Sequence, residues 1–312
     1  MPIATFFHAQ TVASMASLLI SQTDTPAWSS LVPLQPDGGK TPLFAIHGWG
    51  GYLYAFVHLA QAFAPDRPVY GLQAVGLDGK TPRHSTVEAM AEHYCAQIRS
   101  LQPSGPYHIV GYSLGGWIAY AVAHRLLDQG GSIGLLALLD THATANVHTW
   151  LKFDEWLRLG TYLVGRVPHH VGKFFRRPEE GRVAHMKKCL SSQRYYLSCI
   201  LKKKGGKSAH VLMTQAGSSQ VSASYPLVSS DHFFIAHQYY RPPRLNHKVH
   251  LITTKLTSHR AFLFWYYYAR RRVKIHRLFD DHYDYFKADC AEPLAALLRQ
   301  LLDENENPGK GV

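Results

Sequence analysis

A serine flanked by glycines has the surroundings of a nucleophile in this chain. The stretch "GYSLG" places Ser113 between Gly111 and Gly115, after the apolar run "YHIV" and before the helical run "WIAYAVAHRLLDQ". A strand that turns sharply into a helix needs glycines where side chains would collide, and such a turn exposes the serine hydroxyl. The dipole of the following helix favours negative charge at its start. Ser113 is therefore the predicted nucleophile of an acyl transfer.

A serine nucleophile needs a base to accept its proton and an acid to orient that base. On this kind of turn the acid and then the base follow the nucleophile along the chain. The acidic residues between Ser113 and the final helices are Asp128, Asp140, Asp154, Glu155, Glu179, Glu180, Asp231, Asp280 and Asp281. Asp140 alone ends a predicted strand, and "TTKLTSHR", after the next strand, contains no carboxylate. Asp140 is the predicted acid; the alternative is a helix cap for "DTHAT".

The base must be chosen among 20 histidines, most of which we expect at the surface or in the core. His282 follows the last β-like run through the turn "DD" and precedes the last predicted helix. A loop histidine at that place can reach a serine on the same sheet edge. His276 lies within the strand pattern and His259 at the start of the preceding helix, so His282 is the predicted base.

Acyl transfer to serine also needs backbone N–H donors for the tetrahedral oxyanion. The N–H of Leu114, next to the serine, is one predicted donor. The N–H of Trp49, in the glycine loop "HGWGG" after the first strong strand, is the other. The loss of one such donor typically costs about 3 kcal/mol in the transition state. The alternative interpretation of "HGWGG" is an ordinary glycine turn.

Short β-like runs alternate with amphipathic helical runs along the chain. The β-like runs are residues 41–48, 67–74, 106–113, 133–140, 247–254 and 272–279, and the helical runs are residues 52–64, 85–101, 114–129, 258–270 and 291–303. This alternation predicts an α/β fold, with a mostly parallel central sheet that has helices on both faces.

An insertion interrupts the alternation after the strand that ends at Asp140. Residues 143–246 are rich in aromatic and basic residues and have a helical pattern. An insertion of this size at the end of a strand is expected to fold as a cap over the site. We therefore expect a helical lid that carries substrate specificity.

Composition limits the class of protein. The chain has 312 residues, 46% of them hydrophobic, which predicts a sizeable core. No apolar run approaches the roughly 18 residues of a membrane span. The N-terminus has no Lys or Arg before its apolar part and no A-x-A site after it, so no secretory signal is predicted. The four scattered cysteines indicate neither a disulfide framework nor a metal site, which favours a cytoplasmic protein.

The formal charge of +12 is concentrated after residue 150. Such basic runs either attract a negatively charged partner or form a solvated face. No nucleic-acid-binding motif accompanies them, so nucleic acid is the poorer candidate partner.

The motifs together resemble the type I thioesterase domains, members of the α/β-hydrolase superfamily, that end nonribosomal peptide synthetases and related polyketide synthases. The similar stretches include "LVPLQPDGGKTPLFAIHGWGG", "GPYHIVGYSLGGWIAYAVAHRLLDQG", "LLALLDT" and "DDHYDYFKADCAEPLAALLRQLL". The resemblance implies an α/β-hydrolase fold and a catalytic triad of Ser113, Asp140 and His282. The chain departs from the family at Asp280, because a glycine is usual two residues before the histidine.

The N-terminal stretch "PIATFFHAQTVASMASLLI" resembles the last helix of a carrier domain. It lacks the serine motif that bears phosphopantetheine. We expect residues 1–29 to be this carrier-like helix and a linker, and residues 30–312 to be the thioesterase domain. The alternative for the N-terminal stretch is an ordinary docking helix.

The resemblance implies release of an acyl or peptidyl chain from the phosphopantetheine thioester of a carrier protein, upstream in the same chain or in trans. The Ser113 acyl-enzyme would be resolved by hydrolysis or macrocyclisation, without a permanently bound cofactor, metal or membrane partner. The alternatives are a free-standing editing thioesterase, a simple esterase or lipase, and a non-catalytic module that docks carriers. The residues expected to attract an acidic carrier are Arg176, Arg177, Lys187, Lys188, Lys202, Lys203 and Lys204.

Overall fold

The computed structural model describes residues 11–21, 28–141, 236, 240–255 and 265–306. The chain divides into two compact units, residues 1–146 with 226–312 and residues 147–225. All described residues belong to the first unit. Residues 142–235, which include most of the predicted lid, lie outside the described residues. Within the described part of the chain, no helix combines the length and the hydropathy that a membrane span needs.

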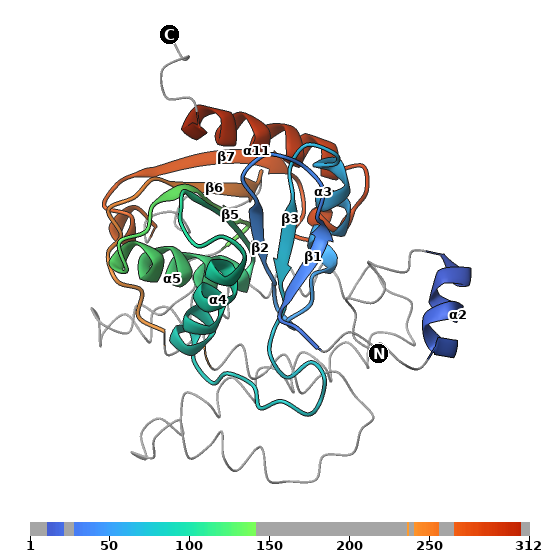
Figure 1. Cartoon of the computed structure of the whole chain (residues 1–312). Helices are drawn as coiled ribbons and strands as arrows, with labels where there is room; N and C mark the ends of the chain where they lie inside the picture. Colours follow the sequence, from blue (N-terminus) through green and yellow to red (C-terminus); the bar gives the residue numbers. More distant parts are fainter. Residues whose placement is uncertain (1–10, 22–27, 142–235, 237–239, 256–264, 307–312) are drawn as a thin grey trace, which may run out of the picture. The chain divides into compact units, whose positions relative to one another are not determined.

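The centre of the described unit is a seven-stranded sheet with strand order β1-β3-β2-β4-β5-β6-β7 (Figure 1). The strands are β1 (Leu31–Gln35), β2 (Leu43–Ile46), β3 (Val69–Leu72), β4 (Tyr107–Tyr112), β5 (Ile133–Leu139), β6 (Val249–Thr254) and β7 (Val273–Phe279). Strand β1 pairs antiparallel with β3, and every other neighbouring pair is parallel. The mostly parallel sheet predicted from the sequence is confirmed.

The antiparallel strand β1 was not among the predicted strands. Its sequence, LVPLQ, contains Pro33, which cannot donate a backbone hydrogen bond and argues against a strand. The strand lies at the edge of the sheet, where proline is tolerated because one side of the strand has no partner strand.

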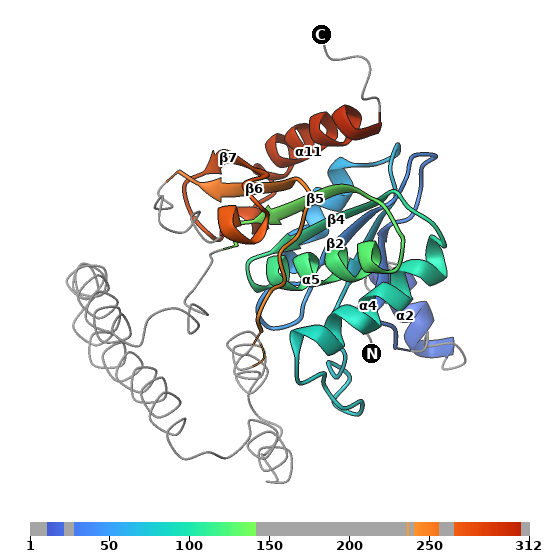
Figure 2. The ribbon, with the colours of Figure 1, turned by 90° about the vertical axis from the view of Figure 1, so that its left-hand side faces the viewer.

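The remaining elements are helical. They are α2 (Val12–Ser21), η1 (Tyr54–Phe56), α3 (Val57–Ala62), α4 (Val87–Leu101), α5 (Leu114–Asp128), η3 (Asp284–Phe286) and α11 (Ala291–Glu306). Figure 2 shows α4 and α5 on one side of the sheet and α11 on the other. Helix α3 packs against α11.

Both faces of the sheet are apolar. Successive side chains of a strand point to opposite faces, and in these strands both sets are hydrophobic. In β2, Phe44 and Ile46 belong to the core with α4 and α5, whereas Leu43 and Ala45 belong to the core with α3 and α11. Strands covered on both faces read as continuous hydrophobic runs. This explains why the parallel strands were recognisable in the sequence.

Helix α11 is fixed at its end by a buried polar cluster. Glu306, its last residue, accepts two hydrogen bonds from the Arg67 guanidinium, at 2.9 and 3.0 Å, and its Oε1 lies 3.0 Å from Nε2 of His108. His108 is in β4 and Arg67 precedes β3, so both lie toward the N-terminal edge of the parallel strands. The cluster therefore joins the C-terminal helix to the centre of the sheet.

Candidate active site

Ser113 lies on a strained turn between β4 and α5. Its φ of 54° is in the left-handed region, which non-glycine residues rarely adopt. A Cβ on Gly111 would collide with the carbonyl of Gly115, and a Cβ on Gly115 would collide with the carbonyl of His47. The glycines therefore allow the helix to start directly against the strand. The Ser113 N–H donates to the carbonyl of Leu139 at 2.8 Å, which fixes the turn to the end of β5.

Asp140 and His282 form a hydrogen-bonded pair at the same edge of the sheet. Nδ1 of His282 lies 2.6 Å from Oδ2 of Asp140, whose side chain is buried. A carboxylate at this contact is the acceptor, so Nδ1 carries the proton and Nε2 of the neutral ring is the acceptor that faces away from Asp140. The structure thus brings together two of the three predicted triad side chains, from positions 142 residues apart.

The backbone at Asp140 holds the carboxylate in place. Its N–H donates to the carbonyl of Ile252 at 2.7 Å, and its φ of 41° is again left-handed. Oδ1 accepts the N–H of Thr254 at 3.4 Å. The neighbouring strand β6 therefore orients the acid, although it contributes none of the predicted triad residues.

The turn that carries His282 is built by Asp284. Its Oδ2 accepts the N–H groups of Asp280 and Asp281, at 3.1 and 2.9 Å, and its Oδ1 pairs with Nζ of Lys287 at 2.7 Å. Asp280 is not among the described non-glycine residues with a positive φ. The turn consequently does not require the glycine that is usual at this position in the resembling family.

Tyr112, the residue before Ser113, contacts His282 in two ways that sequence reasoning missed. Its hydroxyl donates to the main-chain carbonyl of His282 at 2.7 Å, and its ring stacks on the imidazole with centroids 5.0 Å apart. The rings of Tyr285 and Phe286 pack against Tyr112 in turn. The G-Y-S-L-G motif names Tyr112, but no local pattern indicates which distant residue its side chain touches.

The two predicted oxyanion donors lie at the ends of neighbouring strands. Leu114 is the first residue of α5, and Trp49 lies three residues after the end of β2, which pairs with β4. The Trp49 side chain is 46% exposed. The collision that a Gly115 side chain would make with the His47 carbonyl shows how closely the two segments approach.

Two further histidines, His259 and His276, competed with His282 in the sequence as candidates for the base. His276 lies within β7, and its Nε2 is 3.1 Å from Nδ1 of His250 on β6. His259 lies outside the described residues, as do all seven basic residues expected to attract a carrier.

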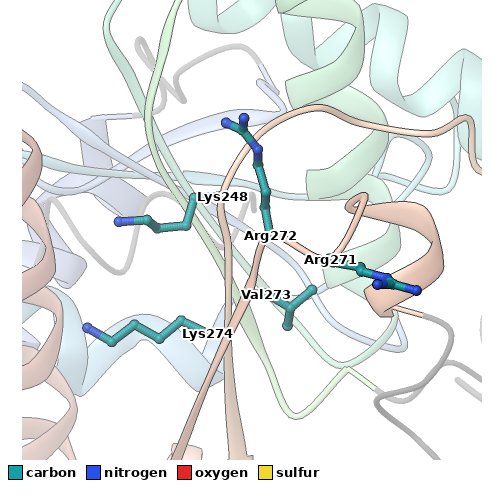
Figure 3. Close-up of a pocket in the computed structure, with 5 residues that line it drawn as sticks. All are labelled: Lys248, Arg271, Arg272, Val273 and Lys274. Atoms are coloured by element: carbon teal, nitrogen blue, oxygen red, sulfur yellow. The ribbon is translucent and has the colours of Figure 1, made fainter.

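A basic surface pocket lies away from Ser113. Its volume is about 340 Å³, and its lining residues are Lys248, Arg271, Arg272, Val273 and Lys274 (Figure 3). These residues lie at the beginnings of β6 and β7, whereas Ser113, Asp140 and His282 follow the ends of their strands. Figure 3 shows the Lys248 and Lys274 side chains extending to the same side, whereas those of Arg271 and Arg272 point in other directions. The pocket is therefore separate from the candidate active site.

Residues 41–156 match the family model of the thioesterase domain. The chain is 40% identical over 151 residues to malpibaldin synthetase of Mortierella alpina. The aligned residues cover 48% of this chain and 3% of that synthetase. It is also 40% identical over 140 residues to the dimodular nonribosomal peptide synthase of Bacillus subtilis (strain 168). This alignment covers 45% of this chain and 6% of that synthase. The chain thus spans only a small part of the length of these relatives.

Solved structures share the fold. A four-domain nonribosomal peptide synthetase bound to AMP and glycine matches with a TM-score of 0.61 and 19% identity, over 93% of this chain and 21% of that chain. The NocB thioesterase domain, in covalent complex with a fluorophosphonate nocardicin G analog, matches with a TM-score of 0.58 and 18% identity, over 87% of this chain and 99% of that chain. The α/β-hydrolase fold expected from the sequence is confirmed.

Proposed function

We propose that this chain, whose residues 41–156 match the thioesterase domain model, releases an acyl or peptidyl chain from the phosphopantetheine thioester of a carrier protein. The observation that carries the proposal is the 2.6 Å contact between His282 and Asp140, at the sheet edge where Ser113 occupies its strained turn. The similarity to parts of nonribosomal peptide synthetases supports a carrier-bound substrate.

In the acylation step, Ser113 Oγ attacks the thioester carbonyl carbon, and His282 Nε2 accepts the serine proton. Asp140 holds the imidazole and stabilises the imidazolium that forms. The N–H groups of Leu114 and Trp49 stabilise the oxyanion of the tetrahedral intermediate. The carbon–sulfur bond then breaks, the proton passes from His282 to the leaving thiolate, and an ester remains on Ser113.

In the release step, a nucleophile attacks this ester while His282 accepts the proton of that nucleophile. The bond between the carbonyl carbon and Ser113 Oγ then breaks, and His282 returns the proton to Oγ. Water gives a linear acid, and an amine or hydroxyl of the bound chain gives a ring. The seven basic residues between Arg176 and Lys204 remain our predicted contacts for the carrier. The carrier can precede this domain in the same chain or act in trans.

The proposal is tested by intact-protein mass spectrometry after mixing the chain with a panel of acyl and peptidyl pantetheine thioesters. We expect the protein mass to increase by one acyl group and the product to be a linear acid or a dehydrated ring. In Ser113→Ala the adduct is lost, and kcat falls by at least about 10³-fold, as expected for one member of a triad.

The matching oxygen esters separate a thioesterase from a simple esterase or lipase, because a thioesterase turns over the thioesters faster. Folded protein that forms no adduct, and does not react with a serine-directed fluorophosphonate, would contradict the proposal and favour a non-catalytic docking module.

A further inference from the structure

His47 lies buried beneath the glycine loop that contains Trp49, immediately after β2. Its Nδ1 is 2.8 Å from the carbonyl oxygen of Gly48, and its Nε2 is 2.9 Å from the hydroxyl oxygen of Tyr94 on α4. Both ring nitrogens therefore have a neighbour within hydrogen-bond distance. The triad chemistry uses neither His47 nor Tyr94.

The contacts decide which nitrogen of His47 carries the proton. A carbonyl oxygen can only accept, so Nδ1 must be the donor to Gly48. Burial lowers the pKa of His47 to about 4, so the ring holds a single proton at neutral pH. Nε2 is then an acceptor. Burial also raises the pKa of Tyr94, whose hydroxyl keeps its proton and donates it to Nε2.

The opposite arrangement is less favourable. The Tyr94 hydroxyl also lies 3.2 Å from the carbonyl of Gln73 and could donate there. Nε2 of His47 would then have to be the donor to Tyr94, and the lone pair of Nδ1 would face the Gly48 oxygen at 2.8 Å. Two unprotonated atoms at that distance repel each other. The Gly48 carbonyl therefore selects the tautomer, and the Tyr94 hydroxyl is the donor that matches Nε2 of that tautomer.

The contact with Gly48 sets the direction of one backbone donor. The Gly48 carbonyl and the Trp49 N–H belong to the same peptide plane, and in a trans peptide they point in opposite directions. The same carbonyl accepts the N–H of Gly51 at 3.2 Å, closing a turn over Trp49 and Gly50. Gly50 and Gly51 have φ values of 95° and 88°. With its carbonyl held toward the buried ring, this peptide turns the Trp49 N–H away from the interior.

We infer that His47 is a positioning residue for the oxyanion donor at Trp49, and that the hydroxyl of Tyr94 holds the imidazole in place by donating to its Nε2. The inference rests on the proposed function, because it needs an oxyanion to form beside Ser113. It adds a specific requirement: a hydrogen-bond donor at the position of Nδ1, rather than merely a buried polar side chain at residue 47.

Two amide substitutions of similar polarity test this requirement. In His47→Asn the amide NH₂ takes the position of Nδ1 and can still donate to Gly48, whereas in His47→Gln it takes the position of Nε2. We expect kcat for a pantetheine thioester to stay within about fivefold of wild type in His47→Asn. In His47→Gln it should fall by about 10² to 10³-fold, the usual effect of losing an oxyanion donor. KM should change little in both, since the donor acts on the transition state.

Tyr94→Phe provides a second test that retains the aromatic packing of α4. It removes the hydroxyl that donates to Nε2 and holds the imidazole in place, so we expect kcat to fall about tenfold with KM unchanged. Thermal unfolding of each variant separates a loss of fold from a loss of positioning. Equal kcat values in the two His47 variants, or wild-type kcat in Tyr94→Phe, would overturn the inference. Failure of the proposed function is recognised separately, because the wild-type chain would then form no acyl adduct.

Discussion

Two left-handed residues carry side chains of the proposed triad. Ser113 and Asp140 have φ values of 54° and 41°, each at the residue that directly follows a parallel strand. Such backbone conformations cost about 1 to 3 kcal/mol each and persist where the surrounding structure enforces them. Here the hydrogen bonds of the two N–H groups, to Leu139 and Ile252, tie both residues to the neighbouring strand. The strain is thus concentrated where the side chains must leave the sheet.

The contact between Tyr112 and His282 predicts a graded loss of activity. Tyr112→Phe removes one hydrogen bond to the His282 carbonyl but keeps the stacked ring, so kcat should fall by about fivefold, equivalent to about 1 kcal/mol. Tyr112→Leu also removes the ring contact and should lower kcat by about 10 to 50-fold. Steady-state kinetics with a pantetheine thioester measure both effects.

Tyr285→Phe is the matched control, because the Tyr285 hydroxyl donates to Ile252 rather than to His282. It should keep kcat within about twofold of wild type. A Tyr112→Leu enzyme as active as wild type would show that His282 is held by Asp140 and its own loop alone.

The loop between β7 and α11 depends on one carboxylate with several partners. Asp284 accepts two backbone N–H groups that precede His282, and it also pairs with the exposed side chain of Lys287. Exposed ion pairs contribute little to stability, whereas a carboxylate that accepts backbone donors shapes a turn. The two kinds of contact should therefore differ in importance.

Asp284→Ala should lower kcat by about tenfold, because the turn that carries His282 loses the carboxylate oxygen that accepts two of its backbone N–H groups. Lys287→Ala should leave kcat unchanged within about twofold. The comparison is made by measuring kcat at saturating thioester and confirming the fold by circular dichroism. A larger defect in the Lys287 variant than in the Asp284 variant would contradict this account of the loop.

Three buried histidines make the stability of the whole molecule sensitive to acid. Burial lowers the pKa of His47, His108 and His250 from 6.5 to about 4 each, with nearby positive charges adding to the effect for His108 and His250. The unfolded chain therefore binds protons near pH 6.5 that the folded chain does not bind, and the free energy of unfolding falls as the pH falls. Glu306, whose pKa is lowered, loses its stabilising contribution only at more acidic pH.

Between pH 7.5 and 5.5 each of these histidines should lower the free energy of unfolding by about 1.3 kcal/mol, or about 4 kcal/mol together. Urea denaturation at the two pH values measures the change. In His108→Gln the pH dependence should be smaller by the contribution of one histidine. A free energy of unfolding that does not change over this range would contradict the burial of these side chains.

Much of the site was predictable from the sequence because its determinants are local. The glycines that flank Ser113 are within two residues of it, and Asp140 and His282 each follow an apolar run that reads as a strand. The strands of a parallel sheet that is covered on both faces are continuous hydrophobic runs. Most of the strands, and the residues that follow them, could therefore be recognised in the sequence. Strand β1 was missed because Pro33 interrupts its pattern, and only its position at the sheet edge makes that proline acceptable.

The tertiary structure alone decided which side chains hold these residues in place. Tyr112 contacts a residue 170 positions later, and Arg67 reaches Glu306 across 239 positions. His47, which directly follows strand β2, meets Tyr94 on helix α4 in the adjacent layer. Such pairs carry no signature in the local pattern of the chain, because each is set by how strands and helices pack in space. The sequence by itself therefore determined the type of fold and predicted the nucleophile and its partners, while packing between distant segments determined how those groups are oriented.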